Sequence, residues 1–278
     1  MKKRTERLRP RARRPFLEDG DSPAALPYLS LVRSPESPMA EAGPNGRFRV
    51  ATYNVHRWTG RTGGGKWNPR LARDVLDELD ADVVALQEVL RPIDGRRHDP
   101  LPAIVEECGY HLAFVCSRRH RNGELGNAIL SRWPFKGVLT FDLSFSRFER
   151  RSAIAAELEC AAGMVAMVAT HLALVDRTRT KQVHAILGHP QLQGPVVLFG
   201  DMNAWRSCRA TRQLDRVLDE RHHNRAWPAT FPATSPLLAL DRIYARGVRV
   251  IDVRTHQSAA ARRGSDHLPV VASIEVEG

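Results

Sequence analysis

The stretch that decides the fold is Pro195-Val196-Val197-Leu198-Phe199-Gly200-Asp201-Met202-Asn203, a short apolar run that ends in two polar residues. Residues 195–199 carry no polar side chain, so we expect a strand that is buried on both faces. Asp201 and Asn203 follow at once, where the end of a strand presents side chains to a cleft. A polar residue after a strand usually caps a turn, so this run alone indicates only a possible site.

The same pattern recurs at five more places along the chain. Polar residues stand at the ends of apolar, strand-like runs, and all of them are Asn, Glu, Asp or His. They are Asn54 after residues 50–53, Glu88 after 83–87, His171 after 167–170, Asp241 within 239–243, and Asp266-His267 just before the last strand. Turn chemistry does not readily explain six such positions, so the pattern predicts one shared site.

The rest of the pattern predicts two groups of strands with helices between them, in one domain covering residues 47–278. We expect two sheets packed face to face with the helices outside. The expected strands are 48–55, 82–89, 110–116, 125–131, 136–143, 151–160, 163–171, 195–199, 239–245, 247–256 and 269–276. The expected helices are 102–108, 177–187, 207–219 and one that begins at Asn68-Pro69.

Residues 1–46 differ in composition from the rest of the chain. They are rich in Arg, Pro, Ser and Glu with little periodicity, which predicts a basic, Pro-rich, disordered arm. The chain has a net charge of +11, and residues 1–46 hold nine basic and six acidic residues, which leaves +8 for the remainder. This excess suits an anionic partner, whether nucleic acid, anionic lipid head groups or a small phosphate ester.

Targeting signals and cysteine spacing both favour a cytoplasmic protein. Arg13-Arg14 resembles the start of a twin-arginine signal, but Glu18 and Asp19 stand where the apolar stretch should follow. The 4 cysteines fit neither a zinc site nor a disulfide framework, so we expect free thiols.

The residue types suit hydrolysis of a phosphate ester. Mg²⁺ prefers one or two carboxylates together with water, and Glu88 and Asp266 could supply them. Asp201 is the candidate that orients and deprotonates the attacking water, while the amides of Asn203 and Asn54 can hold a phosphoryl oxygen. Asp241 and His267 could form a pair in which the carboxylate fixes the tautomer and stabilises the cation.

Six short motifs, in this order, resemble the endonuclease/exonuclease/phosphatase superfamily. They are Thr52-Tyr53-Asn54-Val55, Leu86-Gln87-Glu88-Val89, Thr170-His171-Leu172, Gly200-Asp201-Met202-Asn203, Leu240-Asp241-Arg242-Ile243 and Ser265-Asp266-His267-Leu268-Pro269. The resemblance implies an α/β protein with a four-layer α/β/β/α sandwich of two packed mixed sheets, the DNase I-like fold. It also implies a Mg²⁺-dependent phosphoric ester hydrolase, with Mn²⁺ as a substitute, and a cleft at one end of the two sheets.

The same resemblance assigns roles to individual residues. It implies Glu88 as the principal metal ligand with Asn54 and Asp266 nearby, and Asp201 and Asn203 beside the scissile phosphate. It implies proton transfer by the Asp241–His267 pair and stabilisation of the phosphate by His171. Arg151 resembles a phosphate-contacting position. Glu124 falls near the carboxylate that partners the catalytic His, with a turn residue as its alternative. His56 stands where exonuclease III-like members commonly have an acidic residue, which argues against a second metal and against the abasic-site repair branch.

Four functions remain open at this point. A nuclease acting on nucleic-acid phosphodiesters is favoured by the basic body of the chain and by the Arg-rich residues 91–97. A phospholipid or sphingomyelin-type phosphodiesterase would use Trp58, Trp67 and Trp133, which fall in predicted loops, at a membrane surface. A small-molecule phosphatase and a non-enzymatic binding module rank lower, and no protein partner is implied.

Overall fold

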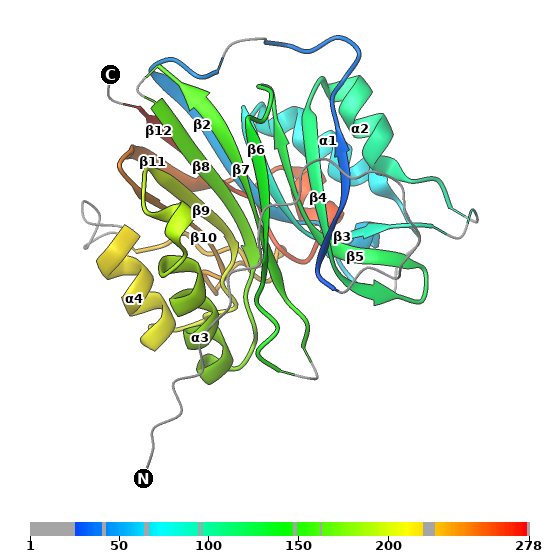
Figure 1. Ribbon diagram of the computed structural model, residues 1–278. Helices are drawn as coiled ribbons and strands as arrows, with labels where there is room; N and C mark the ends of the chain where they lie inside the picture. The colour runs from blue at the N-terminus through cyan, green and yellow to red at the C-terminus, as the bar shows by residue number, and fades with distance from the viewer. Residues whose placement is uncertain are drawn as a thin grey trace.

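Two sheets packed face to face form the centre of the molecule, as the computed structural model shows (Figure 1). It describes residues 26–40, 43–63, 67–93, 95, 97–146, 149–161, 163–218 and 226–276. The seven-stranded sheet has the order β1 (Tyr28–Arg33), β4 (His111–His120), β5 (Gly123–Ser131), β3 (Val83–Arg91), β2 (Arg47–Asn54), β12 (Val270–Glu275) and β11 (Arg249–Thr255). The five-stranded sheet has the order β10 (Asp241–Arg246), β9 (Val196–Asp201), β8 (Gly163–His171), β7 (Ser152–Cys160) and β6 (Gly137–Asp142).

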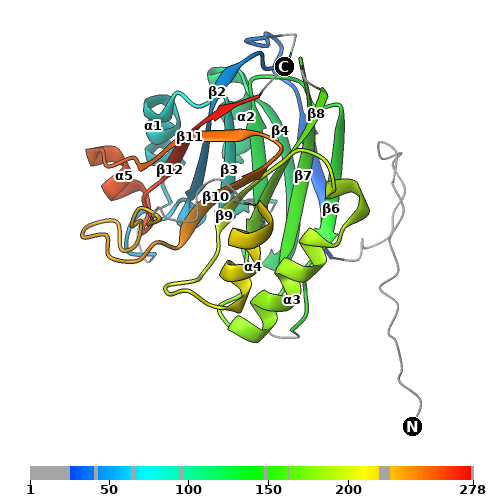
Figure 2. The same ribbon diagram turned by 90° about the vertical axis from the view of Figure 1, so that its left-hand side faces the viewer.

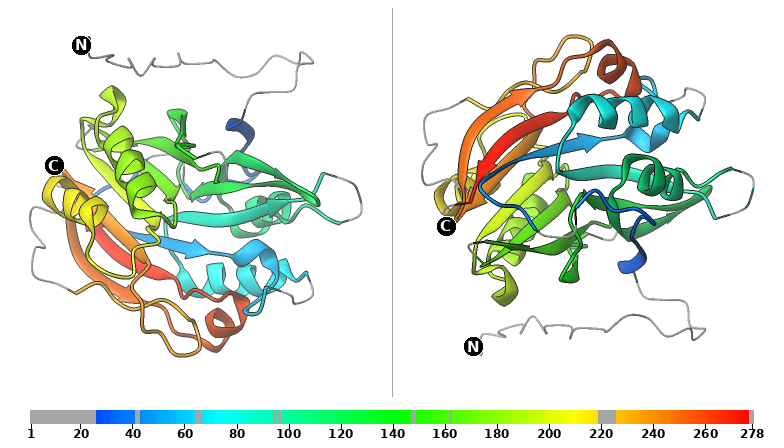
Figure 3. Two further views of the ribbon diagram at one scale, coloured as in Figure 1. Left: turned by 90° about the horizontal axis from the view of Figure 1, so that it is seen from below. Right: turned by 90° about the horizontal axis from the view of Figure 1, so that it is seen from above.

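Helices cover the outer face of each sheet (Figure 3). The seven-stranded sheet is covered by α1 (Pro69–Leu79), α2 (Pro100–Cys108) and α5 (Ala259–Gly264), and the five-stranded sheet by α3 (Asp176–Leu187) and α4 (Arg209–Leu218). Two 3₁₀ turns, His56–Trp58 and Pro190–Leu192, complete the regular structure of the described residues. The expected four-layer α/β/β/α sandwich of two mixed sheets is therefore confirmed.

Three apolar clusters hold the four layers together. One packs α1 and α2 on the seven-stranded sheet, one lies between the two sheets, and one packs α3 and α4 on the five-stranded sheet. The local sequence explains the helices: in α1, Ala72, Val75, Leu76 and Leu79 are buried at helical spacing behind Pro69. Burial of these faces, rather than helix propensity alone, fixes where each helix docks.

The prediction that order begins near residue 48 is wrong for residues 28–33. They form β1, which pairs antiparallel with β4 at the edge of the seven-stranded sheet. The buried Glu124 anchors this strand, because its carboxylate accepts hydrogen bonds from the hydroxyls of Tyr28 and Ser30. The twin-arginine resemblance and the cationic start of the arm lie outside the described residues.

Other expectations from sequence can also be compared with the structure. All four cysteines are free thiols, as expected. In the described part of the chain, no helix is long and apolar enough to cross a membrane. Of the tryptophans proposed for a membrane surface, Trp58 is fully buried. Trp67 and Trp133 are partly buried: Trp67 packs against the core that includes α1, and the ring of Trp133 packs edge-on against Phe48 at 5.6 Å.

Candidate active site

Strand register brings the predicted site residues to one end of the sandwich. β2 and β3 run parallel in one sheet, and β8 and β9 run parallel in the other. Each parallel pair therefore places the carboxyl ends of its two strands side by side. His171 pairs with Asp201 across β8 and β9, and Asp241 pairs with Asp201 across β9 and β10. On the other sheet, Asn54 ends β2 beside Gln87 of β3. Residues far apart in sequence therefore meet in one cleft.

Asp201 lies at the centre of this cleft with its side chain only 2% exposed. Its Oδ2 lies 3.2 Å from Nδ2 of Asn54, 3.3 Å from Nε2 of His171 and 3.8 Å from Nε2 of His267. Its Oδ1 accepts from the backbone N–H of Asn203 at 2.8 Å. Burial raises the pKa of Asp201 to about 6, although the positive charge of His267 opposes the rise. A carboxyl group that titrates near neutrality can accept a proton and return it.

Asp241 and His267 form a buried pair next to Asp201. Nδ1 of His267 lies 2.8 Å from Oδ2 of Asp241, which also accepts from the Thr230 hydroxyl at 2.6 Å. Burial opposes the charged imidazole, but the carboxylates of Asp241 and Asp201 outweigh it and raise the pKa of His267 to about 10. The imidazole of His267 therefore carries two N–H donors at neutral pH, one toward Asp241 and one toward Asp201.

His171 has the opposite protonation preference. Burial and the nearby Arg151 cation lower the pKa of His171 well below its usual value, so this imidazole is neutral. Nη1 of Arg151 donates to Nδ1 of His171 at 3.3 Å, so the single ring proton lies on Nε2, which faces Asp201. Arg151 is also paired with Glu149 at 2.7 Å. His171 is thus a neutral hydrogen-bond donor, and the bond from Arg151 to its other ring nitrogen fixes its orientation.

The seven-stranded sheet contributes a second group of polar side chains. Glu88 and Asp266 are partly exposed, at 25% and 26% of their side chains. Each carboxylate faces a cation or a protonatable ring: Nε of Arg57 lies 3.3 Å from Glu88, and Nδ1 of His56 lies 3.2 Å from Asp266. His56 stands at the position where exonuclease III-like enzymes commonly have an acidic residue, and it places an imidazole next to Asp266.

Asn54 joins the two groups, and Asn203 lies beside Asp201. Oδ1 of Asn54 accepts from the backbone N–H of His56 at 3.0 Å, while its Nδ2 donates to Asp201. Nδ2 of Asn203 donates to the Leu172 carbonyl at 2.8 Å. Each amide uses one of its two N–H donors in these bonds, which leaves one for a substrate oxygen.

The backbone is strained around the site. Glu88 and Asn203 have positive φ values of 52° and 49°, and so does the run His56–Trp58. Such conformations cost about 1–3 kcal/mol each and concentrate at functional sites. Glu88 sits in a bulge where the pairing of β3 with β5 shifts register, and a bulge redirects a side chain. Gly200, with φ +152°, is required because a Cβ would lie 1.9 Å from the Thr170 carbonyl oxygen.

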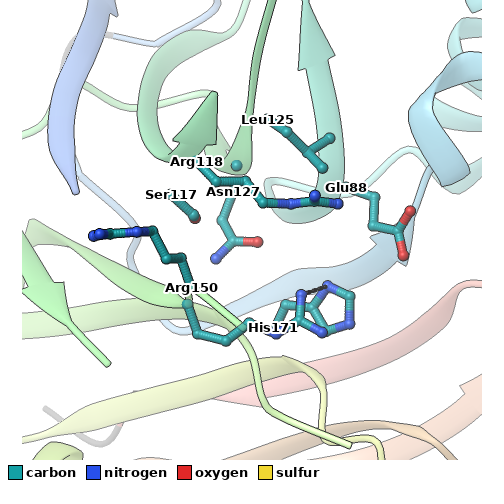
Figure 4. Close-up of a pocket in the computed structure, with 9 residues that line it drawn as sticks. Glu88, Ser117, Arg118, Leu125, Asn127, Arg150 and His171 are labelled. Carbon is teal, nitrogen blue, oxygen red and sulfur yellow. Dashed lines mark hydrogen bonds between the residues drawn. The ribbon is translucent and has the colours of Figure 1, made fainter. Parts of the chain in front are cut away.

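Sequence reasoning missed part of the cleft. Figure 4 shows Arg118, Asn127, Glu88 and His171 converging on one space, which Arg150 also lines. Arg118 follows the apolar part of β4, and Arg150 lies two residues before β7. The cations of Arg118, Arg150 and Arg151 together make this end of the cleft electropositive.

Glu124 does not join this cluster. Besides Tyr28 and Ser30, its carboxylate contacts Nη1 of Arg91 at 3.3 Å and Nη1 of Arg119 at 3.2 Å. It is a residue of β5 rather than of a turn. These contacts explain why Glu124 is buried, and none of them involves the residues around Asp201.

Comparison with known proteins agrees with the fold. Residues 51–267 match the model of the Endonuclease/Exonuclease/phosphatase family. An uncharacterized protein of Escherichia coli K12, YbhP, is 28% identical over 258 residues, which cover 82% of this chain and 96% of that protein. An endonuclease/exonuclease/phosphatase from Beutenbergia cavernae has a similar structure, with a TM-score of 0.65 and 23% identity over 84% of this chain and 72% of that one. D. rerio TDP2 complexed with single strand DNA product has a TM-score of 0.59 and 17% identity over 82% of this chain and 98% of that one.

Proposed function

We propose that this chain, which belongs to the Endonuclease/Exonuclease/phosphatase family, is a metal-dependent hydrolase of phosphodiester bonds in nucleic acid. The observation that carries the proposal is the meeting of two different polar groups across one cleft. Partly exposed oxygen ligands lie on one side, and a buried Asp201–His267–Asp241 chain lies on the other. The first suits a metal ion, and the second suits proton transfer.

Glu88, Asp266 and Asn54 would hold the ion. Their donors are carboxylate and amide oxygens, which Mg²⁺ and Mn²⁺ prefer, and the two carboxylates are open enough to exchange a ligand. The Arg57 guanidinium lies against Glu88 and the His56 imidazole against Asp266, so both carboxylates already face groups that carry or can carry positive charge. When bound, the ion would polarise a phosphoryl oxygen and take up charge on the leaving oxygen.

A second group has the composition of a metal site. Ligand atoms of Asp201, Asp241 and His267 lie within 4.8 Å of one another. We assign this group to proton transfer instead, because all three residues are buried and Nδ1 of His267 already donates to Asp241. A protonated imidazole cannot ligate a metal, and the pKa of His267 is raised.

Asp201, His267, Asn203 and the cleft cations would act on the substrate itself. Asp201 orients a water molecule and takes its proton, while the protonated His267, held by Asp241, donates a proton as charge develops. The free N–H of Asn203 and the cations at the other end of the cleft bind the phosphoryl oxygens. His171 donates from Nε2 toward Asp201 and keeps its carboxylate in position.

Nucleic acid is favoured over lipid for two reasons. Arg118, Arg150 and Arg151 line the cleft, and guanidinium groups suit backbone phosphates. Of the tryptophans that motivated a lipid substrate, Trp58 is fully buried, and Trp67 and Trp133 are partly buried against the apolar clusters. The structurally similar D. rerio TDP2, in complex with a single strand DNA product, supports the same substrate class.

A substrate panel tests the proposal. The full chain is incubated with Mg²⁺ or Mn²⁺ and single-stranded DNA, duplex DNA, RNA, sphingomyelin vesicles or an inositol phosphate. We expect cleavage of at least one nucleic acid, its loss in Glu88→Gln, and its retention in the matched control Glu159→Gln, an exposed residue on β7. Cleavage of the lipid or the inositol phosphate alone would contradict the proposal.

A further inference from the structure

A groove of about 830 Å³ lies between α3 and α4, on the outer face of the five-stranded sheet. Figure 2 shows the two helices side by side over that sheet. Five exposed cations line the groove: Arg177 and Lys181 from α3, and Arg209, Arg212 and Arg216 from α4. Their spacings of four residues on α3, and of three and four on α4, keep each set on one helix face.

The charge of this groove is not neutralised within the fold. Asp176 is the one acidic residue that lines it, and its carboxylate faces Arg179, at 3.5 Å from Nη2. Among the described residues, none of the five cations forms an ion pair. The opposite helical layer differs, because Arg73 of α1 is paired with both Asp77 and Glu107.

Clustering cations in this way lowers the stability of the helices that carry them. Arg177 and Lys181 are four residues apart, as are Arg212 and Arg216, and like charges at that spacing destabilise a helix. An anion in the groove would remove this repulsion. Because the cations form two facing rows rather than one point, the matching ligand is an extended polyanion.

The loops that lead into α3 and α4 connect the active-site residues with the helices that line the groove. Nη1 of Arg179 donates to the carbonyls of Leu174, at 3.1 Å, and Asn203, at 2.7 Å, so these two loops lie side by side. The loops expose Leu174 at 70% and Trp205 at 67%. In the sequence, Trp205 stands two residues after Asn203 of the active site and four before Arg209 of the groove.

We propose that the groove between α3 and α4 binds the phosphates of a single-stranded nucleic-acid segment that leaves the cleft over Trp205. The proposal rests on the proposed function for its choice of nucleic acid. Exposed aromatic rings stack on unpaired bases while cationic grooves follow the backbone. Phe145, which also lines the groove, offers a second ring. The cations span seven residues on α4, roughly 10 Å or three phosphates of one strand, and four residues on α3.

The test compares two triple variants in strand binding. Lys181→Gln/Arg212→Gln/Arg216→Gln removes charge from the groove, and Arg47→Gln/Arg70→Gln/Arg254→Gln removes the same charge from exposed positions on the other sheet and its helix. Fluorescence anisotropy with a labelled single-stranded DNA in EDTA measures Kd over a range of salt concentrations. We expect at least about tenfold weaker binding for the groove variant, and a slope of log Kd against log salt that is lower by about 2, since each phosphate contact contributes about 0.7.

Three results would overturn the proposal. The first is equal binding by the two triple variants, which would mean that only net charge matters. The second is an unchanged salt slope in the groove variant. The third is a groove-dependent interaction with anionic phospholipid vesicles and none with the DNA. Strand cleavage by the unmodified chain with Mg²⁺ is measured separately: groove-dependent binding without cleavage contradicts only the proposed function, and cleavage with equal binding contradicts only the groove. Equal thermal midpoints of the two variants confirm that both are folded.

Discussion

The two walls of the cleft use the same residue types in opposite environments. On the wall of the seven-stranded sheet, the carboxylates of Glu88 and Asp266 are about one quarter exposed, at 25% and 26%. On the wall of the five-stranded sheet, those of Asp201 and Asp241 are 2% and 0% exposed. Hydration makes the first wall able to exchange ions, and burial makes the second able to shift pKa values.

This difference suggests a division of labour within one site. Open carboxylates can bind an incoming cation together with its water. The buried carboxylates of Asp241 and Asp201 instead stabilise the protonated imidazole of His267 and raise its pKa, whereas burial and the Arg151 cation lower the pKa of His171. We call the wall of Glu88 and Asp266 the metal wall and the wall of Asp201 and Asp241 the proton wall. Asn54 donates a hydrogen bond to Asp201 and therefore connects the two walls.

The largest effect is expected from the proton wall. Asp201→Asn removes the base while keeping the shape and the hydrogen bond from the Asn203 backbone. Because general acid–base catalysis contributes about 10²–10⁴-fold, hydrolysis of a nucleic-acid substrate should fall by at least about 10³-fold. Initial rates measure this, with Asp252→Asn on the exposed strand β11 as control. A fall of less than tenfold would contradict the role of Asp201.

Asp241→Asn should have the next largest effect, about 10²-fold on the rate, and should lower the pKa of His267. In the unmodified chain this pKa is raised from 6.5 to about 10, so the pair stabilises the fold fully below pH 6.5. That contribution is lost as the pH rises through about 10. The gap in thermal midpoint between the two proteins should therefore shrink from pH 6 to pH 10. NMR titration of His267 gives the pKa directly, and an unchanged value in the variant would contradict the pairing.

Gly200→Ala should destabilise the fold at strand β9, which carries Asp201. The added Cβ would lie 1.9 Å from the Thr170 carbonyl oxygen, at a φ of +152°. Strain and overlap together should cost at least about 3 kcal/mol of unfolding free energy, measured by urea denaturation. Gly194→Ala is the matched control, because nothing lies within 4 Å of its added Cβ. Equal midpoints for the two variants would show that the strand junction tolerates a side chain.

The smallest effect is expected on the metal wall. Arg57→Gln removes the cation beside Glu88, and the pair is partly exposed. Exposed ion pairs contribute about 0.2–1 kcal/mol, so the variant should bind Mn²⁺ up to about fivefold more tightly. Calorimetry measures the change, with Arg61→Gln on the same loop as control. Weaker binding in Arg57→Gln would mean that Arg57 supports the site rather than competes for it.

The two walls also differ in how well sequence predicts them. Asp201 and His171 end regular strands, Asp241 begins one and His267 shortly precedes one, so apolar runs and strand ends were enough to find them. Arg118, Arg150 and Asn127 were missed, because nothing in the local pattern says that these positions in and before β4, β5 and β7 lie beside Glu88. Long-range register decides that, and it depends on the packing of both sheets.

Strand β1 shows a second limit of sequence reasoning. Its residues look like part of a low-complexity arm, and what orders them is an edge pairing with β4 and the carboxylate of Glu124. The paired residues of β4 lie at least 79 residues away from their partners in the strand, and Glu124 lies 94 residues from Ser30. The positive φ of Glu88 cannot be predicted from the local sequence either, because Glu is not a residue type that favours positive φ.

The central claim is that the metal binds to the open wall and not to the buried one. Titration of Mn²⁺ into the unmodified chain, Glu88→Gln and Asp241→Asn by isothermal calorimetry tests it most directly. The account predicts that Glu88→Gln loses binding by at least about tenfold while Asp241→Asn binds as the unmodified chain does. Loss of binding in Asp241→Asn with retention in Glu88→Gln would place the metal among Asp201, Asp241 and His267 and contradict the account.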